Sequence, residues 1–301
     1  MRSPSKGAAV AQVAEDRIAI TDGKIVGPLR RSVNQAQKIK GSIHNDAVAS
    51  KLGFRGGTVA GSIHLELFPP VLLEAFGDRW FERGTLSINF RNPTTDREPV
   101  RAILKQPYLR EAGAQVEAFI ERDDGMLVGE GTASVGFPPE PTALEALDLN
   151  RFPPGELRIL AGLQAGDVVE SKEIECAASV QIDRLDVITE PLDWYSDSPW
   201  GGPVASPATI VQFLYTHPAR VIGAKAENAV GLFGAIEVRH VNGPMVLDRT
   251  YRIGAEVLAV GESPKTEYVW FSSYADSLDG ARVAEMRMQL RWMKASSQLY
   301  Q

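Results

Sequence analysis

The residues best suited to proton transfer lie in the first half of the chain, in SIHNDAVASKLGFRGGTVAGSIH at 42–64. The imidazole of His44 has an ordinary pKa of about 6.5, so it can accept and return a proton near neutral pH. Asp46 could orient His44 or act as an acid, but an aspartate ahead of AVASKL is also a good helix N-cap. We expect His44 to be the acid/base residue, with a surface or capping role before a short helix as the alternative.

Each of three more polar residues in or near this stretch has two alternative interpretations, one functional and one structural. His64 falls one turn inside a predicted helix, where it either points into a cleft or is a satisfied core residue. Glu66 is a weaker candidate that could instead point toward the other half of the chain. Arg55 lies in a glycine-rich loop, where it could bind a phosphate or a carboxylate or be exposed without a partner.

An aromatic and acidic cluster precedes a Gly-Gly turn in the second half, in LDWYSDSPWGGPVASP at 192–207. Tyr195 could donate a hydrogen bond or a proton, and Asp197 and Trp200 could contact a substrate. The alternative is a packed loop that closes one end of the fold. His217 and His240, near a helix end and on a strand, are expected to be structural.

Several chemistries have no motif in this sequence. There is no Ser-His-Asp spacing, no phosphate-binding loop and no paired metal-ligand motif. Four histidines and one cysteine, Cys176, argue against a structural zinc site, and a lone cysteine excludes an internal disulfide. We therefore expect a small-molecule substrate with no cofactor and no metal.

The two halves of the chain repeat one order of elements, which indicates how these residues are positioned. GGTVAGSIHLELFPPVLLEAF at 56–76 and GGPVASPATIVQFLYTHPARVI at 201–222 each combine a Gly-Gly turn, a Val-Ala pair and an apolar run with helical spacing. Pro69-Pro70 should kink or reset the first helix. Four β-rich stretches follow each helix, within 84–135 and 230–293, and an Asp-Gly turn joins the last two. Each half is therefore predicted to be a long helix followed by an antiparallel meander.

The joint between the halves lies in residues 137–156, where five prolines predict a linker with a short helical stretch from Thr142 to Leu147. We expect an N-terminal domain at 1–140, a proline-rich linker at 141–156 and a C-terminal domain at 157–301. The second domain opens with a strand and a connecting segment at 166–189. Residues 16–31 supply the matching first strand of the N-terminal domain.

Composition bounds the class of protein. The chain has 301 residues, about twice a domain of ~150, and 44% hydrophobic residues can bury a real core. A net charge of -6 without a dense Lys/Arg stripe argues against a nucleic-acid partner. No apolar run approaches the ~20 residues that span a bilayer, and the N-terminal apolar stretch is too short for a secretory signal. We expect a cytoplasmic protein without a membrane partner.

Residues 42–64 resemble the signature region of MaoC-like hot-dog enzymes, where Asp-x-Asn-Pro-x-His-x-Asp precedes a short helix, a Gly-Phe turn and the central helix. His44 and Asp46 match the motif histidine and the later acidic residue, and Gly61 matches the glycine that opens the central helix. Residues 192–207 are similar to the degenerate copy in fused double hot-dog members. The resemblance implies an α+β double hot-dog fold, with two tandem antiparallel sheets each wrapped around a long helix.

The resemblance also implies a reaction, in which water is added to or removed from a carbon–carbon double bond next to a thioester. Backbone N–H groups at the start of the central helix then stabilise the enolate oxygen. Gly61 and Ser62 would supply this site, with Ser206 as the counterpart in the second half. The implied substrate is an acyl-CoA, and two such chains could form a homodimer.

The sequence departs from the family pattern at three places. Ile39 stands where the family has its catalytic aspartate, Gly41-Ser42 replaces Asn-Pro, and Ala60 replaces a histidine. Four functions follow from these observations. The first is MaoC-like hydratase/dehydratase activity. The others are a histidine-dependent lyase on a non-CoA aromatic or secondary-metabolite substrate, a hot-dog thioesterase using Asp46, Glu66 or Asp197, and a non-catalytic acyl-binding module.

Overall fold

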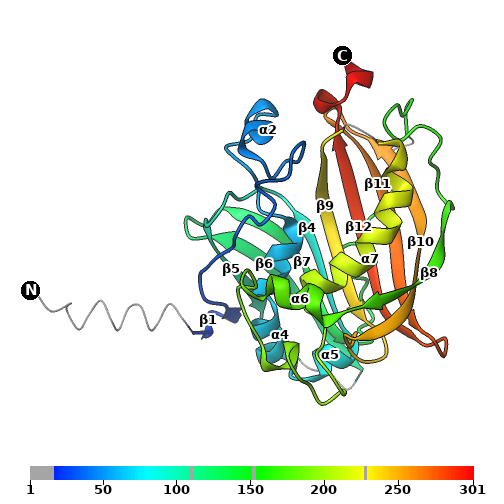
Figure 1. The fold of residues 1–301 in the computed structure, drawn as a ribbon. Helices are drawn as coiled ribbons and strands as arrows, with labels where there is room; N and C mark the ends of the chain where they lie inside the picture. Colours follow the sequence, from blue (N-terminus) through cyan, green and yellow to red (C-terminus); the bar gives the residue numbers. More distant parts are fainter. Residues whose placement is uncertain (1–16, 109–111, 151–153, 227–228) are drawn as a thin grey trace, which may run out of the picture.

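The described strands of the protein belong to one antiparallel sheet, shown in Figure 1 for the computed structural model. The structure describes residues 17–108, 112–150, 154–226 and 229–301. The sheet has 12 strands, in the order β1-β2-β5-β6-β7-β4-β9-β12-β11-β10-β8, with β3 paired to β5. The first half of the chain supplies β1 to β7, and the second half supplies β8 to β12.

The first-half meander matches the predicted stretches. Its strands are β1 (Ala19–Thr21), β2 (Lys24–Val26), β3 (Arg30–Arg31), β4 (Gly84–Phe90), β5 (Pro99–Lys105), β6 (Gly113–Arg122) and β7 (Leu127–Gly136). Gly125 has a φ of +80° in the turn between β6 and β7, a left-handed conformation that glycine adopts without steric cost. The predicted Asp-Gly hairpin is therefore confirmed.

The second half repeats this meander and joins the first through one strand pair. Its strands are β8 (Val168–Cys176), β9 (Gly231–His240), β10 (Arg249–Glu262), β11 (Thr266–Ser277) and β12 (Arg282–Met293). Strand β4 pairs with β9 over five residues, from Thr85 opposite Arg239 to Asn89 opposite Ala235. The sheet is thus continuous across the two halves.

The central helix of the second half is intact, whereas that of the first half is interrupted. Helix α7 (Pro207–Ile222) contacts all five second-half strands. The long first-half helix that we predicted is instead α3 (Gly61–His64), the 3₁₀ turn η1 (Leu65–Leu67) and α4 (Pro69–Phe76). The missing N–H of proline and the clash of its ring break the helical hydrogen-bond pattern, so the predicted reset at Pro69-Pro70 is confirmed.

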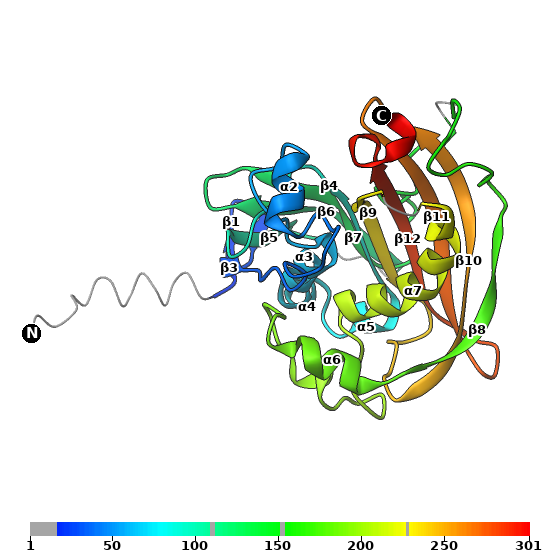
Figure 2. The same cartoon turned by 45° about the horizontal axis from the view of Figure 1, so that its top comes forward.

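Shorter helical segments connect these elements, among them the 3₁₀ turn η3 (Gly223–Lys225) between α7 and β9, and four others lie earlier in the chain. These four are α2 (Asp46–Lys51), α5 (Arg79–Arg83), α6 (Ala178–Leu185) and the 3₁₀ turn η2 (Asp193–Tyr195). Figure 1 shows α2 above the first-half sheet, and Figure 2 shows α6 below α4 in that view. The segment that the sequence indicated only as a connection after β8 therefore contains a helix.

The proline-rich segment is packed against the outer face of the sheet. Leu144 is fully buried in a small apolar cluster with Ala235, Ala259 and Trp270. The hydroxyl of Thr142 donates to the Glu237 carboxylate at 2.5 Å. The predicted helical stretch from Thr142 to Leu147 is a hydrogen-bonded turn rather than a helix. In the described part of the chain, no helix has the length and apolar character needed to span a membrane.

Candidate functional site

A cavity of about 890 Å³ lies between the two halves of the molecule. One wall comes from first-half loops at 34–44, 54–64 and 90–94. The start of β9 and the end of β12 contribute to the opposite wall. The rest of that wall is one face of α7 and the turn after it, made up of Ala208, Val211, Gln212, Tyr215, Ala219 and Gly223. At 1.5 Å rise per residue, this face extends for about 20 Å, so the cavity suits an elongated ligand.

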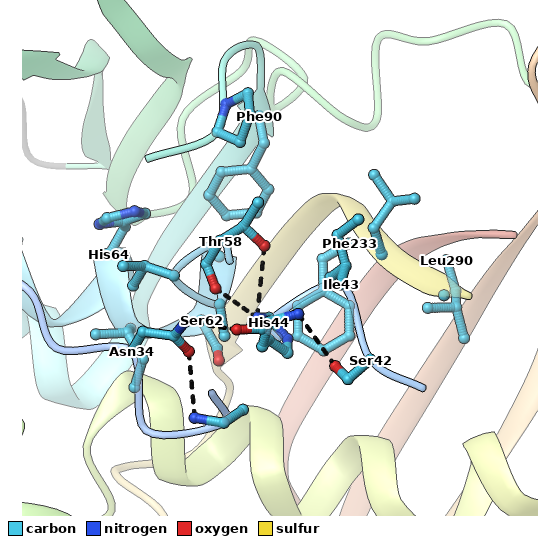
Figure 3. A pocket seen from close by; sticks show the side chains of 18 of the residues that line it. Asn34, Ser42, Ile43, His44, Thr58, Ser62, His64, Phe90, Phe233 and Leu290 are labelled. Atoms are coloured by element: carbon cyan, nitrogen blue, oxygen red, sulfur yellow. Dashed lines mark hydrogen bonds between the residues drawn. The ribbon is translucent and has the colours of Figure 1, made fainter. Parts of the chain in front are cut away.

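His44 lines this cavity with one ring nitrogen held by the backbone. Its Nδ1 lies 2.6 Å from the Thr58 carbonyl oxygen (Figure 3). A carbonyl only accepts hydrogen bonds, so Nδ1 carries the proton and Nε2 holds a free lone pair. Burial lowers the pKa of His44 below its usual value, although the bond with Thr58 partly offsets this. The ring is therefore a neutral base at physiological pH.

The loop that carries His44 is fixed by residues on both sides. The side-chain amide of Asn34 donates to the His44 carbonyl oxygen at 2.8 Å. Gly57 packs so closely that a Cβ there would lie 2.1 Å from the same oxygen. The N–H of Gly57 in turn donates to the Asp46 carboxylate at 2.8 Å. Only glycine fits at position 57, which gives the Gly-Gly pair a physical reason.

Asp46 and Arg55 take structural roles at this loop. The N-cap of α2 is Asn45, whose side chain accepts from two backbone N–H groups, and the predicted capping by Asp46 is wrong. Hydrogen bonds from Gly57 and Gln37 lower the pKa of Asp46, which keeps it ionised and unable to donate a proton. Arg55 is paired with Glu98 at 2.7 Å and does not line the cavity in the described part of the chain, so of its two alternatives the arginine without a partner is wrong, and the carboxylate that it binds is the protein's own.

Gly61 and Ser62 face the same cavity as His44. A Cβ on Gly61 would lie 2.6 Å from the Phe90 ring, so the backbone can approach this ring only at a glycine. Among the described residues, the N–H groups of Gly61 and Ser62 donate to no acceptor, whereas the next N–H, of Ile63, bonds to Ala60. Two adjacent donors are thus available at the cavity wall.

His64 is among the residues that line the cavity, but both of its ring nitrogens contact hydroxyl groups of the first half. Its Nε2 lies 2.8 Å from the Thr94 hydroxyl and its Nδ1 lies 3.5 Å from that of Ser32. Figure 3 shows its ring directed away from His44. Burial lowers the pKa of His64 to about 4, so the ring is neutral. These contacts favour the interpretation of His64 as a satisfied core residue over its interpretation as a residue that points into the cleft.

The second-half cluster lies apart from the cavity. Tyr195, Asp197 and Trp200 are absent from the described residues that line it. Trp200 packs edge-on against Trp194 at 5.1 Å, and both rings contact Phe81. Tyr195 is buried, and its burial, with nearby carboxylates, raises the pKa of its hydroxyl. These contacts favour the interpretation of this cluster as a packed loop over its interpretation as a substrate-contacting group.

The start of α7 is filled by a side chain from the first half. The Glu66 carboxylate accepts from the Ala208 N–H at 2.5 Å and is fully buried. Ser206, the predicted counterpart of the Gly61–Ser62 site, caps α7 through the Thr209 N–H. Burial raises the pKa of Glu66 to about 7. The second half thus has no open equivalent of the Gly61–Ser62 donors.

Sequence reasoning missed Asn34, Thr58 and Arg184. Thr58 acts through its backbone carbonyl, which any residue type would provide. Arg184 lies on α6, far along the sequence from His44, and no local pattern marks it as a cavity residue. No group of three or more metal-binding side chains is present among the described residues.

Comparison with solved structures identifies the fold. A protein from Chloroflexus aurantiacus J-10-fl described as a MaoC domain protein dehydratase matches with a TM-score of 0.62 and 12% identity, covering 92% of this chain and 95% of that one. A Mycobacterium tuberculosis protein described as having a double hot-dog fold matches with a TM-score of 0.58 and 13% identity, covering 91% and 97%. A MaoC-like dehydratase matches with a TM-score of 0.55 and 11% identity, covering 90% and 98%.

The predicted α+β double hot-dog fold is confirmed by these matches. The resemblance to MaoC-like proteins is confirmed at the level of the fold, because identities of 11–13% leave the reaction open. No family model matches the sequence, and the search of curated proteins found no similar sequence.

Proposed function

We propose that the protein is a hydro-lyase that adds water to, or removes it from, a carbon–carbon double bond next to a carbonyl group, with a thioester as the preferred substrate. His44 is the acid/base residue, and the N–H groups of Gly61 and Ser62 bind the carbonyl oxygen. Solved structures of the same fold include proteins described as dehydratases, which makes this chemistry the first to test.

The observation that carries the proposal is the pairing of one oriented base with two free N–H donors in a single cavity. The Thr58 carbonyl holds the proton on Nδ1 of His44, so that Nε2 can take one. The Gly61 and Ser62 donors can stabilise the charge that develops on a carbonyl oxygen when water attacks the β-carbon. Acid/base and oxyanion functions are the two that this reaction needs.

One histidine suffices for a balanced reaction. Nε2 takes a proton from water as the water oxygen bonds to the β-carbon, and electron density moves onto the carbonyl oxygen. The resulting imidazolium then returns that proton to the α-carbon, and the carbonyl reforms. Ile39 lines the cavity at the position of the missing aspartate and has no group that can transfer a proton, so in this proposal His44 makes both transfers.

The thioesterase alternative lacks its carboxylate. None of the three acidic residues considered for it, Asp46, Glu66 and Asp197, lines the cavity in the described part of the chain. Without a carboxylate aimed at an attacking water, hydrolysis has no evident base other than His44. Hydration is therefore the reaction that we favour.

The test is hydration of crotonyl-CoA, followed by loss of enoyl-thioester absorbance and by release of free CoA in the same sample. We expect absorbance to fall without CoA release, and His44→Ala to lower kcat/KM by about 10²- to 10⁴-fold. His217→Ala is the matched control, because that ring bonds to the Glu170 carbonyl outside the cavity. Full activity in His44→Ala would overturn the mechanism, CoA release would indicate a thioesterase, and tight binding without turnover would indicate a binding module.

A further inference from the structure

The cavity is lined by cations and by no acid. Among its described lining residues the charged side chains are Lys40, Arg91, Arg184 and Arg291, and none is an aspartate or a glutamate. The whole chain, in contrast, has a net charge of -6. A concave surface lined by one sign of charge concentrates ligands of the opposite sign. The cavity is therefore built for an anion.

Arg184 lines the cavity without a carboxylate partner, unlike Arg91, which is paired with Glu130. Ion pairs hold many arginines of the described chain, namely Arg30, Arg55, Arg91, Arg97, Arg122, Arg239, Arg252 and Arg282. No described carboxylate forms an ion pair with Arg184. Glu66 is near enough to affect the Arg184 pKa, but its own hydrogen bond is to the Ala208 N–H.

A neutral amide holds Arg184 in place. Its Nη1 donates to the side-chain oxygen of Gln212 at 2.9 Å. The Gln212 amide nitrogen donates to the Thr216 hydroxyl at 3.2 Å, which fixes the oxygen toward Arg184. A guanidinium has five N–H donors, and Gln212 accepts only one of them. The remaining donors are available at the cavity wall near the start of α7.

The position of Arg184 separates it from the other cations. It contacts α7 at Gln212, one turn after Ala208, whose N–H donates to Glu66. Arg291 lies at the end of β12, close enough to Arg91 for that charge to lower the Arg291 pKa further. The cavity thus has one guanidinium held against α7 by a neutral amide, and two further arginines, Arg91 and Arg291, that lie close to each other.

We propose that Arg184 is a specificity-determining residue that binds a carboxylate on the acyl part of the substrate. A single guanidinium can make two parallel hydrogen bonds to one carboxylate, and a half-buried site strengthens them. The preferred substrates are then monothioesters of dicarboxylic acids. The assignment of a thioester as the reacting group rests on the proposed function, but binding of the carboxylate can be measured without any reaction.

The test compares the binding of saturated thioesters, which cannot be hydrated. Dissociation constants are measured by calorimetry for the series from succinyl- to suberyl-CoA, each paired with the monoacid thioester that lacks the terminal carboxylate; glutaryl-CoA and butyryl-CoA form one such pair. We expect at least one diacid to bind about 10- to 100-fold tighter than its partner. Arg184→Gln should abolish this preference and leave butyryl-CoA binding unchanged, which also shows that the variant folds.

Two further variants sharpen the test. Arg184→Lys keeps the charge but loses the paired donors, so it should retain only part of the preference. Arg291→Gln removes a cavity charge elsewhere and should weaken both members of each pair equally. The proposal is overturned if no diacid binds tighter than its partner, or if the preference survives in Arg184→Gln. Neither result depends on whether crotonyl-CoA is hydrated, so this inference and the proposed reaction fail separately.

Discussion

The Thr58 carbonyl determines which nitrogen of His44 can act. Because Nδ1–H donates to this oxygen at 2.6 Å, the lone pair on Nε2 is the only basic site of the ring. Burial disfavours the charged imidazolium and so lowers the pKa of His44. The hydrogen bond to Thr58 thus orients the His44 ring, and desolvation keeps the ring neutral.

The lowered pKa predicts the pH dependence of the reaction. The base must be neutral, so kcat/KM should rise with pH through the pKa of His44, with the midpoint of this rise below the ordinary value of 6.5. The measurement is a pH–rate profile together with an NMR titration of the His44 ring. The His44 ring signal is assigned as the one that is absent from the spectrum of His44→Gln. An acidic limb centred above 6.5, or an NMR pKa that differs from the kinetic one, would contradict the assignment.

Gly61 allows a second prediction at the cavity wall. Gly61→Ala would place a Cβ 2.6 Å from the Phe90 ring, so it should cost about 1–3 kcal/mol of unfolding free energy and lower activity. Phe90→Leu removes the clashing ring edge, so the double variant should be more stable than the sum of the two single effects. Urea unfolding of the four proteins measures this coupling. Strictly additive effects would mean that the ring is not the obstacle.

Residues that lie close together in the chain could be grouped from the sequence, whereas contacts made only in the folded structure could not. His44, Gly61 and Ser62 are carried by one short stretch, and the structure brings them to one cavity. Tyr195 and Trp200 are an equally unusual group of residues, yet they pack against Phe81 and the surrounding core instead. Nothing near Arg184 in the sequence could indicate that α6 places it beside Gln212.

At the scale of elements, Glu66 connects the interrupted first helix to the intact second one. Its carboxylate takes the N–H that a ligand would otherwise use at the start of α7. One helix start is thus left for function and the other is closed by the protein itself. A helix start with its own buried acceptor leaves the N-terminal N–H groups satisfied without a ligand.

The raised pKa of Glu66 predicts how stability depends on pH. An unfolded glutamate ionises near 4.5, whereas Glu66 ionises near 7 in the fold, so the folded chain loses stability as pH rises between these values. From about pH 5 to about pH 8 this loss should be about 2–3 kcal/mol. Glu66→Gln, which can still accept from Ala208, should remove it. Urea unfolding at both pH values tests this, with the exposed Glu74→Gln as control; an unchanged pH dependence in Glu66→Gln would refute it.

The meander of each half could be predicted because its signals are local. Alternating burial in β6 and the left-handed Gly125 turn both come from neighbouring residues. The five prolines predict a linker, but they could not indicate that Leu144 within it packs against Trp270 on the sheet. Such packing depends on a surface that forms only after the sheet does.

At the scale of the whole molecule, the β4–β9 pair makes the two halves one unit. The buried core cluster contains residues from both halves, including Leu86 and Ile88 on β4 and Ile236 and Val238 on β9. The cavity lies between the halves, so its geometry depends on this seam. A chain with one sheet and one shared core should unfold in a single cooperative transition.

This cooperativity can be tested at the seam. Ile88, fully buried on β4 opposite Ile236, should cost about 2–5 kcal/mol when truncated to alanine. All tryptophans except Trp80 lie in the second half, so their fluorescence reports mainly on that half. If the halves unfold together, Ile88→Ala in the first half lowers the urea midpoint of fluorescence and of far-ultraviolet circular dichroism by the same amount. The control is Ile20→Ala on the exposed strand β1, which should move neither midpoint. An unshifted fluorescence midpoint in Ile88→Ala would show that the halves unfold independently.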